Sequence, residues 1–355
     1  MFLKNLQLIN FRNYSALDLA FDVRPTILVG NNAVGKSNLL ESIYVLSTTK
    51  SPRAENEDEL IKSGERITRI EGNLEEGGDP TQLLITLSKS QDLPAGRQDF
   101  KKRVQVNGVN RRVVDYVGNF PVILFSPVDI NMVTGSPALR RWHLDLSLVQ
   151  VDVAYKRSLT LYEQVLTSRN KVLKRIKDGQ GQMDELDYWT NELVKDGDVV
   201  SSARKAFLEA MNNFKSPLGN FKFNYHQSLL SRDRLYEYSS REIAAGVTLI
   251  GPHRDDFTVE QDGRDLSHFG SRGEQRTATL AFKLATLEYM ALTLDQRPML
   301  LLDDVFSELD GDHRKHVLEI VGRQQTIMAT VELENIPKSF LKQARILKVE
   351  NGKII

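Results

Sequence analysis

The chain has 355 residues, of which 41% are hydrophobic, and this supplies enough apolar area for more than one folded lobe. Lysine and arginine together number 47, as do aspartate and glutamate, so any nucleic-acid-binding surface must be a local patch. The sequence contains no cysteine, which excludes a disulfide framework, thiol catalysis and cysteine-based zinc sites.

The sequence carries no recognisable targeting or membrane signal. Residues 1–14, "MFLKNLQLINFRNY", lack the uninterrupted apolar core of a signal peptide. No stretch approaches the roughly 18 consecutive apolar residues that a membrane span needs. We therefore expect a cytoplasmic protein without a membrane partner.

The first part of the chain predicts a mixed α/β lobe. Strand-like runs at 2–9 and 16–21 come before the apolar run "PTILVG" at 25–30. This apolar run predicts a buried strand that ends at a glycine turn. A helix is expected directly after the turn, over residues 36–46.

Further strands are expected before residue 125. The runs "RITRIEGNL" and "QLLITLSK" alternate apolar and polar residues, which predicts solvated antiparallel strands. Asn107-Gly108 lies between β-branched runs and predicts a hairpin. The segment "SQDLPAGRQD" at 90–99 predicts an exposed loop, and "PVILF" at 121–125 predicts another strand.

The middle of the chain predicts helices. Ser136-Pro137 resembles a helix cap followed by a first helical position, and helical patterns continue to about residue 214. Their heptads do not persist, so a compact lobe is favoured over a long coiled coil. From Gly246 the α/β pattern returns and ends in the hairpin-like "RILKVENGKII". We therefore predict one α/β lobe, residues 1–129 and 246–355, split by a helical lobe, residues 130–245.

A phosphate-binding loop is predicted between the buried strand and the helix that follows it. "GNNAVGKS" at 30–37 matches G-x-x-x-x-G-K-[ST], whose backbone N–H groups surround phosphates while its lysine supplies a cation. A chance glycine-rich turn is the alternative. The residues expected to bind nucleotide are Gly30, Asn31, Asn32, Ala33, Val34, Gly35, Lys36, Ser37 and Asn38.

Two carboxylates are expected at the same edge of the sheet. The apolar run at 299–302 predicts a buried strand that delivers Asp303 and Asp304 at its carboxyl end. We expect Asp303, with the Ser37 hydroxyl, to bind Mg²⁺ and Asp304 to act as general base on the attacking water. The alternative is a pair of acids that caps a strand-to-helix turn.

The stretch "FGSRGEQRT" at 269–277 resembles the signature loop of ABC-class ATPases. In that class a Ser-Gly-Gly-Gln-like loop at a helix start contacts the γ-phosphate bound by the opposite subunit, and here glutamate replaces glutamine. The alternative is an ordinary helix cap. The residues predicted for this role in trans are Ser271, Arg272, Gly273 and Glu274. Ser307 and Asp310 match the subunit-facing S-x-L-D loop of the same class.

These motifs, in this order, resemble the RecF family of bacterial DNA replication and repair proteins. The resemblance spans the chain and includes "NFRNY", "GNNAVGKSNLLESIY", "FSPVDI", "GSPALRRWHLD", "LIGPHRDDF", "SRGEQRT" and "LLLDDVFSELD". It implies an α/β fold: an ABC/SMC-like P-loop ATPase head with an inserted, mainly α-helical second lobe and no long coiled coil.

The resemblance also implies a function in recombinational repair, replication-fork maintenance and the SOS response to DNA damage. Such a protein forms a homodimer with ATP and Mg²⁺, binds gapped DNA at single-strand/double-strand junctions in the nucleoid, and assists recombinase loading with the mediator proteins RecO and RecR. We expect a weak, DNA-stimulated ATPase. By the same resemblance Arg12 lies near the nucleotide; an arginine that begins an edge strand is the alternative.

The chain departs from the wider ABC class at two positions. Ser126-Pro127-Val128-Asp129 stands where a glutamine would follow the strand at 123–125, and Val331-Glu332 stands where a switch histidine would follow "TIMAT". Asp304 is also one methylene shorter than glutamate. Because of these departures, the sequence does not identify the residues that position the attacking water. They also predict slow hydrolysis.

A basic cluster in the predicted hairpin is the candidate DNA contact. Side chains two positions apart on a strand share a face, so part of the cluster would present cations to phosphates. A solubilising strand edge is the alternative. The residues are Lys101, Lys102, Arg103, Arg111 and Arg112.

Three other functions fit part of the pattern. A P-loop kinase acting on a small molecule would have no use for Ser271. An ABC transporter subunit would be expected to have the missing glutamine and a membrane partner. A non-catalytic clamp would bind nucleotide without turning it over.

Overall fold

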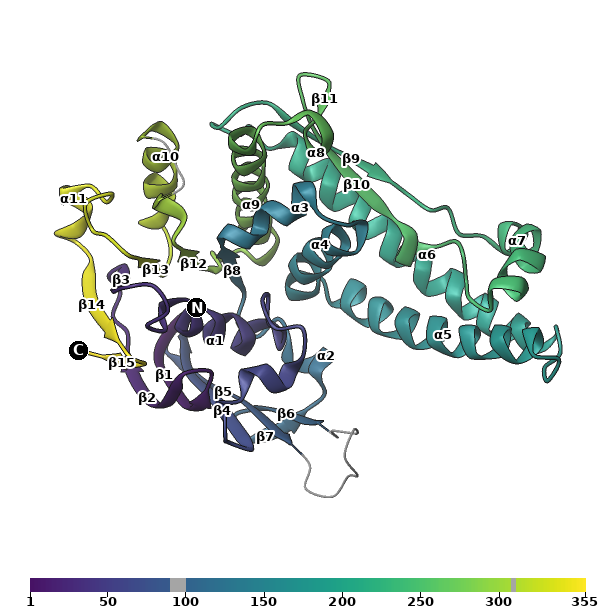
Figure 1. Ribbon diagram of the computed structural model, residues 1–355, viewed down its shortest axis with the longest axis horizontal. Coiled ribbons are helices and arrows are strands. Elements are labelled where there is room, and N and C mark those ends of the chain that lie inside the picture. Colours follow the sequence, from purple (N-terminus) through teal and green to yellow (C-terminus); the bar gives the residue numbers. More distant parts are fainter. Residues whose placement is uncertain (90–99, 308–310) are drawn as a thin grey trace. The chain divides into compact units, whose positions relative to one another are not determined.

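The computed structural model describes residues 1–89, 100–307 and 311–355, and the predicted loop at 90–99 lies outside this range. The chain divides into two compact units, one of residues 1–129 and 290–355 and the other of residues 130–289. Figure 1 shows the first unit in purple, blue and yellow and the second in teal and green.

A mainly parallel sheet forms the core of the first unit. Its strand order is β15-β14-β3-β13-β12-β8, and only the short β15 runs antiparallel to its neighbour. Because the other strands are parallel, their carboxyl ends lie along one edge. The strands are β3 (Thr26–Val29), β8 (Val122–Phe125), β12 (Met299–Asp303), β13 (Thr326–Thr330), β14 (Arg345–Glu350) and β15 (Lys353–Ile354).

The second sheet of this unit is antiparallel, with the order β2-β1-β4-β5-β6-β7. Polar and apolar side chains alternate along its strands, so one face packs inward and the other meets solvent. The strands are β1 (Phe2–Phe11), β2 (Tyr14–Ala20), β4 (Ile67–Glu76), β5 (Asp79–Lys89), β6 (Phe100–Val106) and β7 (Val109–Arg111). The hairpin predicted at Asn107-Gly108 is confirmed by the β6–β7 pairing.

Helix α1 (Lys36–Thr48) contacts strands of both sheets, and this explains why nearly all of its residues are buried. Leu39, Ile43 and Leu46 have no exposed area, although the helix also carries buried polar residues. The predicted helix at this position is therefore confirmed. The other helices of this unit are α2 (Val113–Tyr116), α10 (Gly311–Val321) and α11 (Lys338–Leu341), with 3-10 turns at Glu57–Leu60, Pro127–Ile130 and Val305–Ser307.

The second unit is mainly helical and contains a small antiparallel sheet, β11-β10-β9. Helices α5 and α6 pack along one another, and none of the helices among the described residues is long and apolar enough to cross a bilayer. The helices are α3 (Asn131–Thr134), α4 (Pro137–Val151), α5 (Val153–Lys177), α6 (Glu185–Asn213), α7 (Arg232–Ala245), α8 (Leu266–Phe269) and α9 (Arg272–Leu294). The strands are β9 (Phe221–His226), β10 (Asp256–Gln261) and β11 (Arg264–Asp265), and Pro252–Arg254 form a 3-10 turn.

Residues 246–289 belong to the helical unit, whereas their local sequence pattern predicts that they belong to the α/β lobe. The reason is strand pairing, because β10 pairs along its full length with β9, which lies within the predicted helical lobe. Helix α9 belongs to the same unit as far as Tyr289. The domain boundaries themselves stay a prediction.

A buried ionic network ties the helical unit together. The Arg204 guanidinium pairs with Asp145 at 2.7 Å and with Asp255 at 3.3 Å, and it donates to the Pro252 carbonyl at 2.7 Å. Asp255 has no exposed area and also accepts hydrogen bonds from Tyr225 and from the Ser228 N–H, the latter at 2.8 Å. The motif "GPHRDD" therefore serves this unit structurally through its first aspartate.

We predict that Asp255→Ala destabilises the helical unit by about 3–5 kcal/mol, because Arg204 then keeps a buried charge with one partner fewer. Both tryptophans, Trp142 and Trp189, belong to this unit, so urea unfolding followed by tryptophan fluorescence reports on it alone.

Arg254→Ala is the matched control from the same motif. Its side chain is exposed, and we expect a change within about 0.5 kcal/mol. A loss below about 1 kcal/mol for Asp255→Ala would show that the network does not hold the unit together.

Candidate functional site

The predicted phosphate-binding loop connects β3 to α1. Gly35 is the residue before the helix and has φ 119°, in the left-handed region that favours glycine. A Cβ atom at Gly35 would lie 2.6 Å from Asn13 Nδ2, so the close packing of the loop also requires glycine here. The free N–H groups of the first turn of α1 and the positive end of its dipole make this loop an anion site.

Lys36 lies across the loop. Its ammonium group donates to the carbonyls of Gly30 at 2.7 Å and Asn31 at 2.8 Å, and the residue is 7% exposed. Burial lowers the pKa of Lys36, while the charges of Asp304 and Asp303 act in the opposite direction. The loop thus holds one cation close to two carboxylates.

The hydroxyl of Ser37 donates to Asp303 Oδ1 at 2.7 Å, which joins the two motifs across 266 residues of sequence. Burial raises the pKa of Asp303, and the hydrogen bond from Ser37 and the charge of Arg53 partly offset this. A hydroxyl and a carboxylate oxygen side by side form the kind of hard-oxygen pair that Mg²⁺ prefers.

Asp304 follows β12 in a left-handed conformation with φ 51°, which is uncommon for a residue other than glycine. Its N–H donates to the Ala329 carbonyl of the neighbouring strand at 3.0 Å, so the turn is fixed by the sheet. Asp304 leaves the strand at the same edge as Asp303.

A cleft of about 290 Å³ brings these groups together. It confirms that residues of the loop lie beside both aspartates. Its lining residues are Asn32, Ala33, Gly35, Lys36, Ser37, Asn38, Arg53, Pro127, Asp303, Asp304 and Val331. Pro127 and Val331 come from the two segments where the ABC class has a glutamine and a histidine.

Arg53 lines this cleft but is missed by the sequence analysis. Its guanidinium donates to Asn38 Oδ1 at 2.8 Å and to Glu41 Oε2 at 2.7 Å. Asn38 and Glu41 are three residues apart on one face of α1, whereas Arg53 comes from the segment after the helix. No sequence pattern marks this arginine, because only the folded chain returns it to the loop.

Arg12, which was expected near the nucleotide, is absent from the cleft lining among the described residues. Its guanidinium forms a two-pronged contact with Glu41, at 3.0 and 2.8 Å. Glu41 is 1% exposed; burial raises its pKa, but hydrogen bonds from Arg12 and Ser51 and the charge of Arg53 lower it overall. Arg12 therefore supports the site through Glu41.

The predicted signature segment begins helix α9 in the second unit. The Ser271 N–H donates to Glu274 Oε2 at 2.7 Å, and the Glu274 N–H donates to the Ser271 hydroxyl at 3.3 Å. This reciprocal pair is a capping box, which leaves Ser271, Arg272 and Gly273 exposed. Of the predicted dimer loop, Ser307 ends a 3-10 turn, and Asp310 lies outside the described residues.

The basic cluster divides between two faces of the antiparallel sheet. Lys102 donates to the Thr49 carbonyl at 2.8 Å and pairs with Glu57, and Arg112 pairs with Asp115 at 2.8 Å. Arg111 stands opposite the buried Val104.

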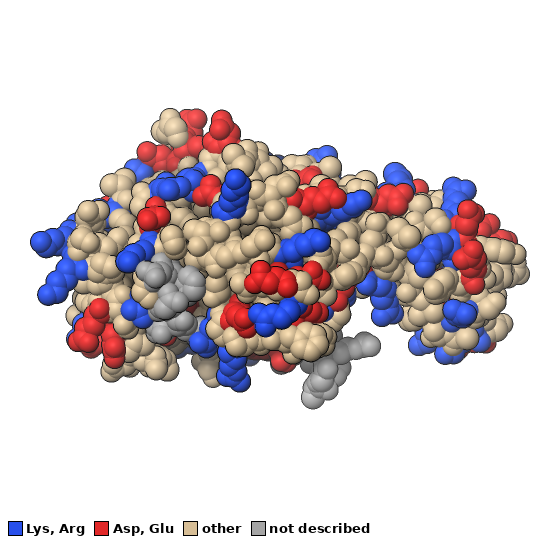
Figure 2. Space-filling view, turned by 90° about the horizontal axis from the view of Figure 1, so that it is seen from above, with Lys and Arg blue, Asp and Glu red and all other residues tan. Residues whose placement is uncertain are grey.

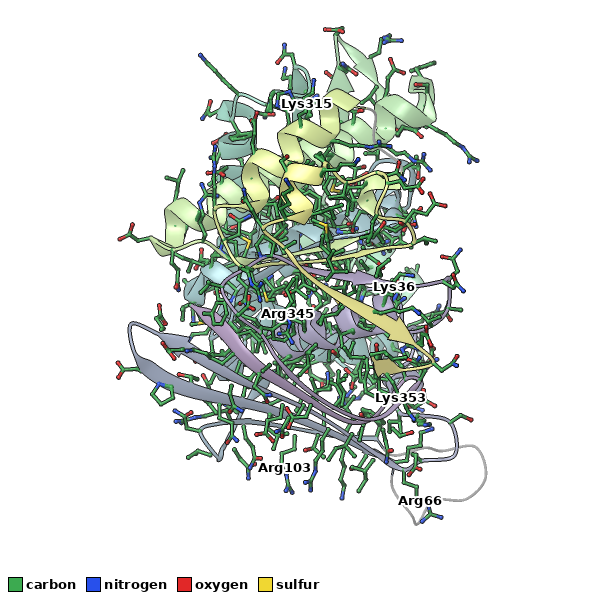
Figure 3. The ribbon with its side chains drawn as sticks, turned by 90° about the vertical axis from the view of Figure 1, so that its left-hand side faces the viewer. Lys36, Arg66, Arg103, Lys315, Arg345 and Lys353 are labelled. Atoms are coloured by element: carbon green, nitrogen blue, oxygen red, sulfur yellow. The ribbon has the colours of Figure 1, made fainter. Side chains whose placement is uncertain are left out.

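Lys101 and Arg103 are exposed on the other face, where Arg103 and Arg69 flank Thr86 across three strands. In Figure 3 Arg103 projects from the outer face of this sheet, while Lys36 lies beyond its other face. Figure 2 shows basic and acidic side chains interspersed over one face of the molecule, as expected for a chain without net charge.

Comparisons with known proteins agree with this geometry. Residues 2–354 match the profile described as the RecF/RecN/SMC N terminal domain. The chain is 36% identical to the DNA replication and repair protein RecF of Bacillus velezensis, with 100% of both chains covered. It is 35% identical to the same protein of Bacillus cytotoxicus, with 100% of this chain and 98% of that one covered.

Two solved structures of the recombination mediator protein RecF in the RecFOR pathway are also similar. The RecF-ATP structure has a TM-score of 0.89 and 28% identity, and covers 100% of this chain and 97% of that one. The RecF-ATPrS structure has a TM-score of 0.86 and 28% identity over 99% and 97% of the two chains. The predicted fold class, an ABC/SMC-like ATPase head, is thereby confirmed, and the chain belongs to the RecF family of DNA replication and repair proteins.

Proposed function

We propose that the chain is an ATP-dependent DNA-binding protein that dimerises on gapped DNA, is reset by slow ATP hydrolysis, and assists recombinase loading together with RecO and RecR. The hydrogen bond between Ser37 and Asp303 is the observation that carries the proposal. It brings a phosphate-binding loop and a carboxylate strand into one site. Similarity to a RecF structure with ATP supports ATP as the nucleotide.

The residues of the cleft fit a nucleotide with Mg²⁺. Lys36 and the first N–H groups of α1 would hold the phosphates, and Arg53 would add a second cation beside them. Ser37 and Asp303 would hold Mg²⁺, which neutralises charge that develops on the phosphates. Among the described residues no cluster of three or more His, Cys, Asp or Glu forms a metal cage, and Mg²⁺ in such sites needs few protein ligands.

Asp304 is the proposed general base. Its carboxylate comes from a turn whose backbone N–H is fixed to β13. Pro127 and Val331 line the same cleft and offer no side chain that could accept a proton. Slow turnover is the expected consequence.

Ser271 is proposed to act on the nucleotide of a second subunit. The capping box leaves the Ser271 side chain at an exposed helix start, where a further anion could approach. Lys36 and Asp303 already serve phosphates and metal within one subunit. ATP would therefore join two copies of the chain.

Mass in solution, measured with and without ATP·Mg²⁺, tests dimerisation. We expect ATP to convert the wild-type monomer to a dimer, and Lys36→Met to abolish this by removing nucleotide binding. Ser271→Arg should bind ATP with wild-type affinity and remain a monomer, because Ser271 is not among the residues that line the cleft around Lys36 and Asp303. Normal dimerisation of Ser271→Arg would contradict the role in trans.

Single-turnover hydrolysis tests the role of Asp304. We expect Asp304→Asn to slow hydrolysis by about 10²–10⁴-fold while ATP affinity stays within a few-fold, since asparagine also tolerates the left-handed turn. A single-turnover rate equal to that of the wild type would contradict the role of Asp304 as general base. Binding without hydrolysis in the wild type would indicate a non-catalytic clamp instead.

DNA affinity at several salt concentrations tests whether DNA binds the face of the antiparallel sheet that carries Lys101 and Arg103. We expect Lys101→Ala/Arg103→Ala to weaken binding of gapped DNA and to reduce the slope of log affinity against log salt by about 2, the number of phosphate contacts removed. Arg111→Ala/Arg112→Ala removes the same charge and should have little effect, because neither residue belongs to that face. Equal losses for the two pairs would point to a non-specific effect of net charge.

If the wild type binds ATP but no DNA, a P-loop kinase or another ABC-class ATPase subunit acting on a non-DNA substrate becomes the better explanation.

A further inference from the structure

The C-terminal hairpin touches the phosphate-binding loop. Strands β14 and β15 are joined by the two-residue turn Asn351-Gly352, whose φ angles are 49° and 71°. The Gly352 N–H donates to the carbonyl of Val34 at 2.9 Å. In Figure 3 the yellow hairpin that carries Lys353 lies on the same side of the molecule as Lys36.

The Val34 carbonyl is held by a second donor as well. Asn13 Nδ2 donates to it at 3.0 Å, and Asn13 Oδ1 accepts from Asn38 Nδ2 at 2.8 Å. The next carbonyl, that of Gly35, accepts from the buried Tyr14 hydroxyl at 3.0 Å. Three groups from outside the loop thus fix two successive carbonyls.

Fixing these carbonyls also fixes the N–H groups that a phosphate would use. In a planar trans peptide the carbonyl and the N–H of the following residue point in opposite directions. Gly352 and Asn13 hold the oxygen of the Val34–Gly35 peptide, and Tyr14 holds that of the Gly35–Lys36 peptide. The N–H groups of Gly35 and Lys36 are therefore turned the other way before any anion arrives.

We propose that the Asn351-Gly352 turn, together with Asn13, is a positioning element of the nucleotide site that preorganises the loop for a diphosphate. Preorganisation raises affinity because the loop does not have to be ordered on binding. The proposal rests on the proposed nucleotide binding, and it assigns a role in that site to the C-terminal turn.

The structure supplies a matched pair of turns for the test. Asn107-Gly108 joins β6 and β7 with φ angles of 50° and 76°, so its backbone closely resembles that of Asn351-Gly352. A Cβ atom at Gly108 would meet nothing within 4 Å. A Cβ atom at Gly352 would lie 2.9 Å from the Asn13 carbonyl oxygen and 3.3 Å from Asn13 Nδ2.

The experiment compares Gly352→Asn with Gly108→Asn by calorimetric titration of Mg·ADP, whose diphosphate occupies the loop without requiring a dimer. Asparagine tolerates positive φ, so both variants carry similar backbone strain and only Gly352→Asn displaces Asn13. We expect Gly352→Asn to weaken binding about tenfold, roughly the effect of one lost hydrogen bond, and Gly108→Asn to bind within about twofold of wild type.

A second variant removes the partner donor. Asn13→Ala should also weaken Mg·ADP binding about tenfold, and the double variant with Gly352→Asn should be little weaker than either single variant, because both act on one carbonyl. Additive losses in the double variant, or wild-type affinity in both single variants, would overturn the proposal. A wild type that binds no Mg·ADP would instead contradict the proposed function.

Discussion

The hydrogen bond between Ser37 and Asp303 is the contact on which the rest of the site depends. It requires β3 and β12 to be parallel and separated by one strand, β13, so that their carboxyl ends meet at one edge of the sheet. Parallel strands need crossover connections, and the two partners are 266 positions apart in the sequence. The long insertion of the helical unit is compatible with this geometry, because it begins after β8 and the chain returns through α9 to β12.

The same edge concentrates charge that would be unfavourable elsewhere. Burial lowers the pKa of Lys36, and the charges of Asp304 and Asp303 partly offset this shift. Burial raises the pKa of Asp303, and the hydrogen bond from Ser37 and the charge of Arg53 partly offset that shift. Behind them, Glu41 is nearly fully buried and is stabilised as an anion by Arg12 and Arg53. Arg53 therefore pairs with Glu41 and also lines the cleft. A ligand that draws Arg53 toward its phosphates would leave Arg12 as the partner that keeps Glu41 paired.

The sequence predicted the parts of the site that are local. Loop 30–37 and the pair Asp303-Asp304 could be recognised because a glycine-rich loop between strand and helix, and an apolar run that ends in two acids, are contiguous sequence patterns. Arg53, Asn13 and Gly352 could not, since each acts through a tertiary contact with the loop. The basic hairpin shows the same limit. Composition identified the cluster, but only the folded chain pairs Lys102 with Glu57, 45 positions earlier in the sequence. Residues 246–289 were assigned to the α/β lobe from their local pattern, although β10 pairs with β9 of the helical unit.

These contacts also explain how the loop is held in one conformation by groups outside it. Positions 31–34, Asn-Asn-Ala-Val, carry no charge and little bulk, so their own side chains do not dictate a conformation. Order comes from outside, through carbonyls held by Asn13, Tyr14 and Gly352 and through the close approach of Val349 O to Gly30, where a Cβ atom would lie only 2.4 Å away. The N-terminal strands and the last strands of the chain therefore meet at the phosphate-binding loop. A site built in this way is complete only when the first unit has folded from both ends of the sequence, which couples nucleotide affinity to the integrity of the whole head.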